Sequence, residues 1–206
     1  MKAVSNSSTG IVLLAAGESS RMSGRPKQLL LFRGQSLIRH AAETALATKC
    51  QPIVIVLGAN AELLQTEVED LPLQIVINPN WADGMSSSIK IGLSVLLAQN
   101  PELEAVVIML CDQPLITPKI INRLIEVYGQ TKKPLVAACY SDATGVPALF
   151  AREMFDELLN LAGDVGAKFV IKKYANAVEK VSIPEAAFDV DTREDYEKLQ
   201  AVNDPL

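Results

Sequence analysis

The sequence predicts an α/β fold: a mostly parallel β-sheet with helices on both faces, forming a three-layer sandwich. The first observation behind this prediction is a series of short, continuous runs rich in Val, Ile and Leu, which are typical of strands buried on both faces. The second is that segments with helical periodicity alternate with these runs, which is typical of parallel sheets. A length of 206 residues suits one domain. We therefore expect a single domain over residues 1–206, with residues 1–9 as a flexible N-terminal tail.

The expected strands follow from the apolar runs, taken in chain order. They lie at residues 11–16, 53–57, 73–77, 105–111 and 135–140, with a short strand at 147–150 and another at 178–183. The helical patterns lie between them, at residues 37–46, 61–69, 86–99, 118–128, 152–161 and 165–174. Ser36 is suited to cap the first helix, and the Thr192 to Asp195 spacing is typical of the start of a closing helix.

Composition excludes several classes of function. Apolar residues make up 49% of the chain and charged residues 21%, as in ordinary globular proteins. The formal net charge is −5 and aromatic residues make up only 5%, so we expect no nucleic-acid partner. No apolar run has the length of a membrane span and the N-terminus lacks the apolar stretch of a signal peptide, so we predict a cytoplasmic protein with no membrane partner.

The cysteines and the single histidine give no metal or redox motif. Cys50, Cys111 and Cys139 form no CxxC pair, and we interpret them as buried free thiols. His40 lies on the face of an expected helix and is interpreted as a structural imidazole. A histidine-rich zinc site is excluded because the chain has one histidine.

The loop after the first expected strand carries the clearest chemical signal. The strand ends at Gly17, and Arg21, Arg25 and Lys27 follow within a few residues. Gly17 permits a sharp turn and the close approach of a ligand to the backbone. Cations concentrated in one loop of an acidic protein indicate a site for a polyanion. Neither the P-loop pattern GxxxxGK[ST] nor the dinucleotide pattern GxGxxG is present in this loop.

The same stretch, IVLLAAGESSRMSGRPKQLLL at residues 11–31, resembles the signature LAAGxSxRMGxxK of nucleotidyltransferases. It is most similar to the branch of molybdenum cofactor cytidylyltransferases and guanylyltransferases. Ser23 stands where that signature usually has glycine, and Gly24 follows it. The resemblance implies a Rossmann-like sandwich of the nucleotide-diphospho-sugar transferase type. It also implies transfer of a nucleoside monophosphate from an NTP to a phosphate on a small acceptor, with release of pyrophosphate.

The resemblance assigns roles to the residues of this loop. Leu14, together with the segment 15–17 (Ala15, Ala16 and Gly17), would line the base and ribose, and Ser19 adds a small donor. Arg21 would hold the outer phosphates, and Lys27 would contact the α-phosphate. Backbone amides and cations suit this chemistry, because positioning and electrostatics supply nearly all of the catalysis of nucleotidyl transfer.

Acidic residues near two other strand ends suggest a metal site. Asp112, in the segment CDQP, follows a buried strand, where a carboxylate suits Mg²⁺ bridging phosphates, with Mn²⁺ as an alternative. Alone it would more simply be a turn residue before Pro114, but the cationic loop favours the catalytic interpretation. By resemblance Asp191, in the segment DVDT, completes the metal site. Asp189 lies on the same side of an extended chain and is the alternative second ligand.

The segment NPNWADGMSSSI, residues 78–89, resembles the part of the family that faces the nucleotide and the acceptor. The resemblance adds four residues to the expected nucleotide-binding set: Asn78, Gly84, Ser86 and Ser88. The serine amides open a helix N-terminus, which suits an anion. Trp81 is either a core anchor or a lid over the ligand.

Two further segments resemble the acceptor side of the family, GVPALF at residues 145–150 and GDVGAK at residues 163–168. They give Gly145, Pro147 and Lys168 as expected acceptor-binding residues, with Pro147 in a rigid turn. A solvated Lys168 remains open as an alternative. By resemblance the acceptor is molybdopterin bearing molybdenum, and the client would be a molybdenum hydroxylase.

The sequence LAAG, as opposed to LAGG, resembles that of the cytidylyl branch, and this resemblance implies CTP. Three alternatives remain open at this point. The first is a guanylyltransferase that uses GTP on the same cofactor, and the second is a nucleotidyltransferase that acts on a sugar or alditol phosphate. The third is a non-catalytic carrier of the molybdenum cofactor.

Overall fold

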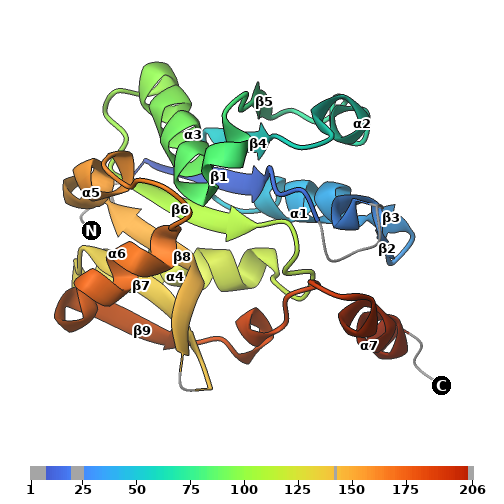
Figure 1. The fold of residues 1–206 in the computed structure, drawn as a ribbon. Coiled ribbons are helices and arrows are strands. Elements are labelled where there is room, and N and C mark those ends of the chain that lie inside the picture. The colour runs from blue at the N-terminus through green and yellow to red at the C-terminus, as the bar shows by residue number, and fades with distance from the viewer. Residues whose placement is uncertain (1–7, 20–25, 142, 204–206) are drawn as a thin grey trace.

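The chain is arranged around a twisted β-sheet that runs through the middle of the molecule (Figure 1). The computed structural model describes residues 8–19, 26–141 and 143–203. The sheet has seven strands in the order β5-β4-β1-β6-β8-β7-β9. Their bounds are β1 Thr9–Ala15, β4 Ile53–Leu57, β5 Gln74–Ile77, β6 Ala105–Leu110, β7 Leu135–Tyr140, β8 Ala143–Ala151 and β9 Val178–Ser182.

Strand direction confirms a mostly parallel sheet. β1 pairs in parallel with both β4 and β6, β4 with β5, and β7 with β9. β8 pairs antiparallel with β6 on one side and with β7 on the other. The carboxyl ends of β1 and β6 therefore meet at one edge of the sheet, which is where ligands bind in such folds.

Helices cover both faces of the sheet, which gives the predicted three layers. Helices α1, α2 and α4 pack on one face, and α3, α5 and α6 pack on the other. The helix bounds are α1 Leu37–Leu46, α2 Ala61–Gln65, α3 Met85–Gln99, α4 Pro118–Thr131, α5 Phe155–Leu159, α6 Ala167–Lys173 and α7 Arg193–Asn203. Short 3₁₀ turns complete the list: η2 Lys27–Leu29, η3 Trp81–Asp83, η4 Arg152–Met154, η5 Ala175–Ala177 and η6 Pro184–Ala187.

The closing helix packs away from the main sheet, against a small hairpin. Strands β2 (Leu31–Phe32) and β3 (Gln35–Ser36) form this hairpin. Leu199 of α7 shares a small apolar cluster with Phe32, and Gln200 Nε2 donates a hydrogen bond to the Leu31 carbonyl at 2.7 Å. This packing brings the segment before α7 close to the loop after β1.

Several expected elements differ in the structure. β1 begins at Thr9, which is buried and pairs with Ala105, so the expected tail does not include this residue; residues 1–7 lie outside the described part of the chain. β5 was expected to be buried on both faces, but Gln74 and Ile77 are exposed because β5 is an edge strand. Helix α2 ends at Gln65 and not near residue 69.

The largest difference concerns the expected turn at Pro147. Pro147 lies inside β8, a nine-residue strand, and not in a turn. The pairing between β7 and β8 shifts register between Ala137 and Ala138, so that the stretch around Pro147 is bulged. A bulge accommodates proline because the missing N–H then leaves no gap in the ladder of hydrogen bonds.

The expected helix caps are confirmed. Ser36 Oγ accepts a hydrogen bond from the Arg39 amide, and Thr192 and Asp195 exchange hydrogen bonds at the start of α7. Among the described residues, none of the helices has the length and apolar character needed to span a bilayer.

Candidate functional site

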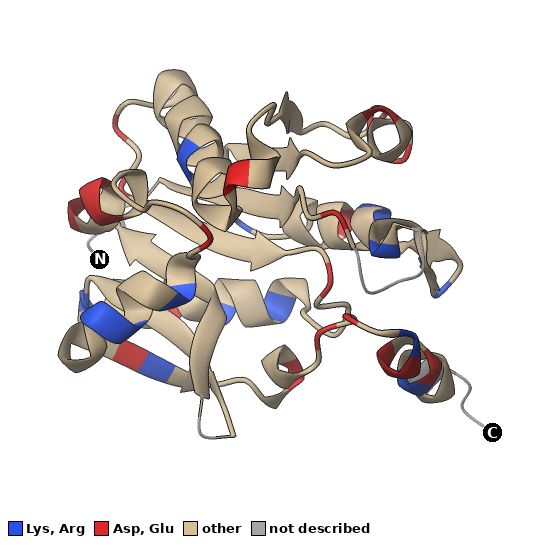
Figure 2. Cartoon of the chain, in the orientation of Figure 1, with Lys and Arg blue, Asp and Glu red and all other residues tan. Residues whose placement is uncertain are grey.

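A cleft of about 570 Å³ opens at the carboxyl ends of β1 and β6. Residues 14–18 form one side of this cleft, and the segment around Trp81 and Gly84 forms another. Acidic residues of the loop after β6 and of the segment before α7 also line the cleft, and Figure 2 shows acidic positions on both segments. The cleft therefore brings Lys27, from the loop after β1, together with the predicted metal ligands.

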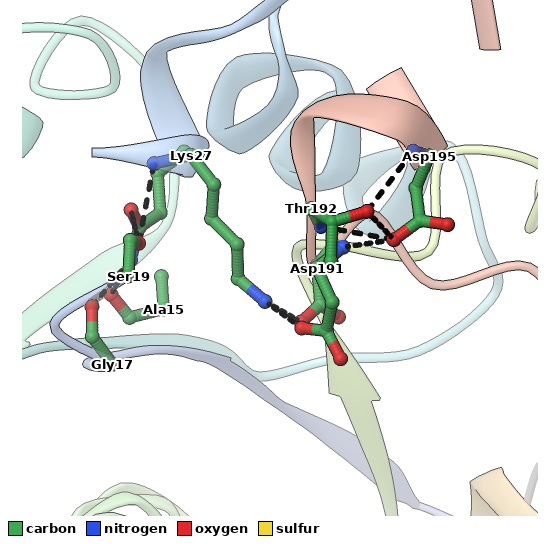
Figure 3. Close-up of polar contacts among 9 residues, drawn as sticks. Ala15, Gly17, Ser19, Lys27, Asp191, Thr192 and Asp195 are labelled. Atoms are coloured by element: carbon green, nitrogen blue, oxygen red, sulfur yellow. Dashed lines mark hydrogen bonds and ion pairs between the residues drawn. The ribbon is translucent and has the colours of Figure 1, made fainter. Parts of the chain in front are cut away.

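Lys27 lies at the centre of the charged end of the cleft. Its Nζ lies 2.5 Å from Asp112 Oδ2 and 2.7 Å from Asp191 Oδ1, and Figure 3 shows the side chain extended toward the carboxylates. The side chains of Lys27 and Asp112 are only 13% and 16% exposed, and that of Asp191 is 34% exposed. Two carboxylates from distant parts of the chain thus converge on one ammonium group.

Backbone contacts hold the two acidic segments together. The Val190 amide donates a hydrogen bond to the Asp112 carbonyl at 2.9 Å, which places Asp189 and Asp191 beside Asp112. Asp195 Oδ2 accepts hydrogen bonds from the Thr192 amide and hydroxyl at 2.9 and 2.7 Å (Figure 3). The start of α7 therefore fixes the segment that carries Asp191.

The electrostatics follow from burial and from the close carboxylates. Burial alone would lower the pKa of Lys27, but Asp112 and Asp191 outweigh it and raise that pKa, so the side chain remains an ammonium. Burial, followed by the negative charge of Asp112, raises the pKa of Asp189. Burial raises the pKa of Cys111 to about 12, so this thiol stays protonated at neutral pH.

Gln28 holds the described ends of the loop after β1, a role that we did not predict. Its side chain is buried, and its Nε2 donates to the carbonyls of Ala15 and Gly17. Its Oε1 accepts a hydrogen bond from Ser19 Oγ at 2.9 Å, and Ser19 Oγ in turn accepts one from the Lys27 amide. Gln28 therefore ties Lys27 to the end of β1.

The turn itself differs from the expectation for Gly17. The left-handed backbone conformation in the described part of this loop lies at Ser19, with φ of 63°, and not at Gly17. The space beside Gly17 is open, since a Cβ built there would meet nothing within 4 Å. Gly17 thus leaves room for a ligand, while the hydrogen bonds of Ser19 hold the turn.

The carboxylate oxygens in the cleft suit a hard divalent cation. Asp112 Oδ1 and Asp189 Oδ1 are buried and have no hydrogen-bond partner among the described residues. The described residues contain no group of three or more Asp, Glu, His or Cys side chains that would hold a metal by itself. A cation here would therefore take one or two carboxylates and complete its coordination with substrate oxygens, as Mg²⁺ usually does.

The structure brings most of the predicted site residues together. The predicted residues that line the cleft are Leu14, Ala15, Ala16, Gly17, Lys27, Gly84, Ser88, Asp112, Asp189 and Asp191. Trp81 packs against the core on the α3 side, as expected of a core anchor, and it also lines the cleft. Arg21, predicted to hold the outer phosphates, lies outside the described residues.

Asn78 and Ser86 do not line the cleft, although the resemblance placed them at the nucleotide. Asn78 is buried, and its amide nitrogen donates to the hydroxyls of Ser87 and Ser88 at 2.8 and 3.0 Å. Ser86 Oγ donates to the Gly163 carbonyl at 2.7 Å. Both side chains therefore organise the start of α3, which borders the cleft at Gly84.

The expected acceptor residues lie beside the cleft and not in it. Lys168 borders a smaller pocket next to the main cleft, and its Nζ lies 5.8 Å from the centre of the Tyr140 ring. Gly145 contacts the same Tyr140. Gln113 and Tyr140, which we did not predict, line this pocket. In the sequence, Gln113 could have been noticed because it follows Asp112 directly, whereas nothing pointed to Tyr140.

Comparison with known proteins agrees with this geometry. Residues 11–178 match the family model of the MobA-like NTP transferase domain. The chain is 32% identical to nicotine blue oxidoreductase of Paenarthrobacter nicotinovorans over 198 residues, which is 91% of this chain and 94% of that protein.

Solved structures of similar proteins cover almost the whole chain as well. The crystal structure of an Rv0371c homologue from Mycobacterium sp. strain JC1 is 32% identical, with a TM-score of 0.81, over 94% of this chain and 96% of that one. Rv0371c of Mycobacterium tuberculosis H37Rv, crystallised in complex with manganese, is 27% identical, with a TM-score of 0.76, over 93% and 96%. The chain therefore belongs to the family of MobA-like NTP transferase domains.

Proposed function

We propose that this protein transfers CMP from CTP to the terminal phosphate of molybdenum-bearing molybdopterin and releases pyrophosphate. The observation that carries the proposal is the convergence of Lys27, Asp112 and Asp191 beside the loop after β1. A cation in the wall of the cleft, with carboxylates next to it, suits a triphosphate better than an uncharged ligand. Membership of the NTP transferase family supports the same reaction class.

In the proposed reaction, an oxygen of the acceptor phosphate attacks the α-phosphorus of the nucleotide. The bond from the α-phosphorus to the oxygen that bridges to the β-phosphate breaks as the new bond forms, and pyrophosphate leaves. Lys27 would neutralise charge on the α-phosphate, and Arg21 would hold the outer phosphates. The open space beside Gly17 admits the nucleotide against the backbone, and the first turn of α3, at Gly84, adds amide dipoles.

Asp112 and Asp191 would hold a divalent cation, Mg²⁺ or Mn²⁺, which supplies charge neutralisation on the triphosphate. The buried Asp112 Oδ1 without a hydrogen-bond partner supports this assignment. Asp191 is favoured over Asp189 as the second ligand because it already shares one ammonium group with Asp112. The manganese complex of Rv0371c supports a divalent metal in a related protein.

The test is a pyrophosphate assay with each of CTP, GTP, ATP and UTP, in Mg²⁺ or Mn²⁺, with and without molybdenum-loaded molybdopterin. We expect release only with acceptor and metal present, and fastest with CTP. Lys27→Ala and Asp112→Asn should each reduce the rate by at least about a hundredfold, since each removes charge stabilisation. Asp156→Asn is the control, because Asp156 is exposed at the start of α5 and lines neither the cleft nor the smaller pocket beside it.

The outcome also separates the alternatives. Faster release with GTP would make the protein a guanylyltransferase, and release with a sugar or alditol phosphate in place of the pterin would change the acceptor class. Tight pterin binding without pyrophosphate from any NTP would favour a non-catalytic carrier. Unchanged release in both Lys27→Ala and Asp112→Asn would refute the mechanism. A molybdenum hydroxylase is the proposed client, which reconstitution of such an enzyme with the product would test.

Redox chemistry is a second candidate, and a specific observation favours it. The relative from Paenarthrobacter nicotinovorans, which matches almost the whole chain, is named as an oxidoreductase. If this chain shares that activity, it should catalyse reduction of nicotine blue by an added electron donor, with no requirement for an NTP. The loss of the colour of the dye would measure this.

A further inference from the structure

A small side pocket lies next to the main cleft, between the ends of β6 and β8 and the helix α6. Its volume is about 170 Å³, against about 570 Å³ for the main cleft, so it suits a single ring system better than a whole nucleotide. The two spaces share Leu14, Met85, Leu110 and Asp189 as walls. A molecule whose phosphate lies in the cleft would therefore reach the side pocket directly.

Gln113 presents a buried hydrogen-bond acceptor to this pocket. Its side chain is only 4% exposed. Its Nε2 donates to the carbonyls of Val146 and Ala186, at 3.3 and 3.2 Å, which fixes the orientation of the amide because a flip would set its oxygen against two carbonyl oxygens. Its Oε1 consequently has no hydrogen-bond partner in the described part of the chain.

Two more buried polar atoms of the same pocket lack hydrogen-bond partners among the described residues. They are Asp189 Oδ1 and the Tyr140 hydroxyl. A buried polar atom without a partner costs about 1–3 kcal/mol, so three in one small pocket indicate that a ligand satisfies them. Gln113 and Asp189 offer acceptors, and tyrosine offers a hydroxyl that donates or accepts.

The pocket has apolar walls, and a cation is among its lining residues. Leu14, Ile108 and Val146 supply apolar surface, while exposed Lys168 lies over the Tyr140 ring. Gly145 makes this arrangement possible, because a Cβ there would lie 2.6 Å from both the Tyr140 hydroxyl and Lys168 Cε. The walls suit the faces of a planar ring, and the acceptors suit an edge that bears N–H groups.

We propose that the side pocket binds the heterocyclic ring of the acceptor through an edge with neighbouring N–H donors, as a 2-amino-4-oxo-pyrimidine ring presents. Gln113 Oε1 and Asp189 Oδ1 accept from this edge, and the Tyr140 hydroxyl completes the contact. This inference rests on the proposed transfer to a pterin-type acceptor. It separates the roles of the two closely spaced acids: Asp191 belongs to the cation site and Asp189 to recognition of the acceptor.

The test measures binding of free pterin and of lumazine by their fluorescence, in the presence of a saturating non-hydrolysable CTP analogue. Lumazine carries an oxo group where pterin carries the amino group, so it sets an oxygen against the acceptors of the pocket. We expect pterin to bind at least about tenfold more tightly than lumazine, since one donor is lost and acceptors are left unpaired. Equal affinity for the two rings would overturn the inference.

Variants make the test specific to this pocket. Tyr140→Phe removes a hydroxyl that makes no hydrogen bond within the described structure, so it should fold normally and bind pterin about three- to tenfold more weakly. Gly145→Ala should abolish pterin binding by displacing Tyr140 and Lys168. Tyr128→Phe, on α4, is the matched control and should bind as wild type does. Unchanged pterin affinity in both pocket variants would refute the proposal.

The same preparation tells this failure apart from failure of the proposed function. If pyrophosphate release with CTP is intact but pterin affinity is unchanged in both pocket variants, the acceptor ring binds elsewhere and only this inference fails. If no NTP yields pyrophosphate although pterin binds with the expected pattern, the transfer reaction fails and the pocket assignment stands.

Discussion

The Nζ of Lys27 lies 2.5 Å from Asp112 Oδ2, and the same ammonium group lies 2.7 Å from Asp191. The lysine therefore lies between the two carboxylates that we propose as ligands of a divalent cation. Because an ammonium group and a metal ion compete for the same negative charge, Lys27 should weaken metal binding until a phosphate draws it away.

Lys27→Met tests this competition. We expect the variant to lose transfer activity but to bind Mn²⁺ about tenfold more tightly than wild type without nucleotide, because two carboxylates are left uncompensated. Its free energy of unfolding in EDTA should fall by about 1–3 kcal/mol and recover when Mn²⁺ is added. Calorimetric titration and thermal unfolding measure the two effects. Weaker Mn²⁺ binding in the variant would contradict the proposed competition between Lys27 and the metal ion.

Gly84 and Gly129 form a pair with opposite predictions. Gly84 has φ of 102°, and a Cβ there would lie 2.6 Å from Asp164 Cα, so Gly84→Ala should destabilise the fold by about 2 kcal/mol or more and distort the cleft. Gly129 lies exposed in α4 with open space around it. Gly129→Ala should stabilise the protein by about 0.5–1 kcal/mol. Urea denaturation of both variants checks the two signs.

Gln28 should matter for nucleotide binding although it is buried away from solvent. Gln28→Leu removes the hydrogen bonds to Ala15, Gly17 and Ser19, and we expect a loss of about 1–3 kcal/mol in stability. We also expect the KM for CTP to rise about tenfold, because the loop that carries Lys27 is no longer fixed. Gln200→Leu, which loses one exposed hydrogen bond to Leu31, is the control. An unchanged KM in Gln28→Leu would show that the loop needs no such tie.

His40 gives the protein a predictable response to mild acid. Burial lowers the pKa of His40 below its ordinary value of 6.5, although the hydrogen bond of Nε2 to the Pro114 carbonyl opposes this. Between the lowered pKa and 6.5 the unfolded chain binds more protons than the folded one. The free energy of unfolding should therefore fall as pH drops below about 6.5, by at most about 1.4 kcal/mol per pH unit from this group.

His40→Gln keeps a donor for Pro114 and removes the titration. Urea denaturation at pH 7.5, 6.5 and 5.5, values chosen to span about one pKa unit on either side of the histidine range, should show a smaller loss of stability in the variant. An identical loss in wild type and variant would mean that other groups cause it.

The pattern of apolar runs was enough to predict the sheet and its layers. That Lys27 and Asp112 share one site was expected from the family resemblance, and it fits the fold because parallel strands bring their carboxyl ends to one edge. The direction of β8 was not predictable, since a buried strand reads as the same apolar run in either direction. Pro147 was placed in a turn because a bulge depends on the register of the neighbouring strand, which no local pattern encodes.

The hydrogen-bond partners of polar side chains could not be predicted from the sequence either. Asn78 and Ser86 were assigned to the nucleotide from sequence, yet their hydrogen bonds go to Ser87, Ser88 and Gly163. Gln28 and Gln113 were not predicted, because the role of a buried glutamine becomes apparent only when the carbonyl groups around it are known. The carboxylates were easier to predict, since Asp112 follows a buried strand and pairs with the cationic loop in one motif set, and the family resemblance pointed to Asp191.

The last strand of the sheet ends at Ser182, whereas Asp191 follows it and is held by the turn into α7. When synthesis has reached the end of β9, every strand of the main sheet has been made, but only one of the two acids that face Lys27. A chain that stops before Asp191 also lacks Leu199, which is buried with Phe32, so a premature stop codon in this final stretch should remove activity and part of the apolar packing together.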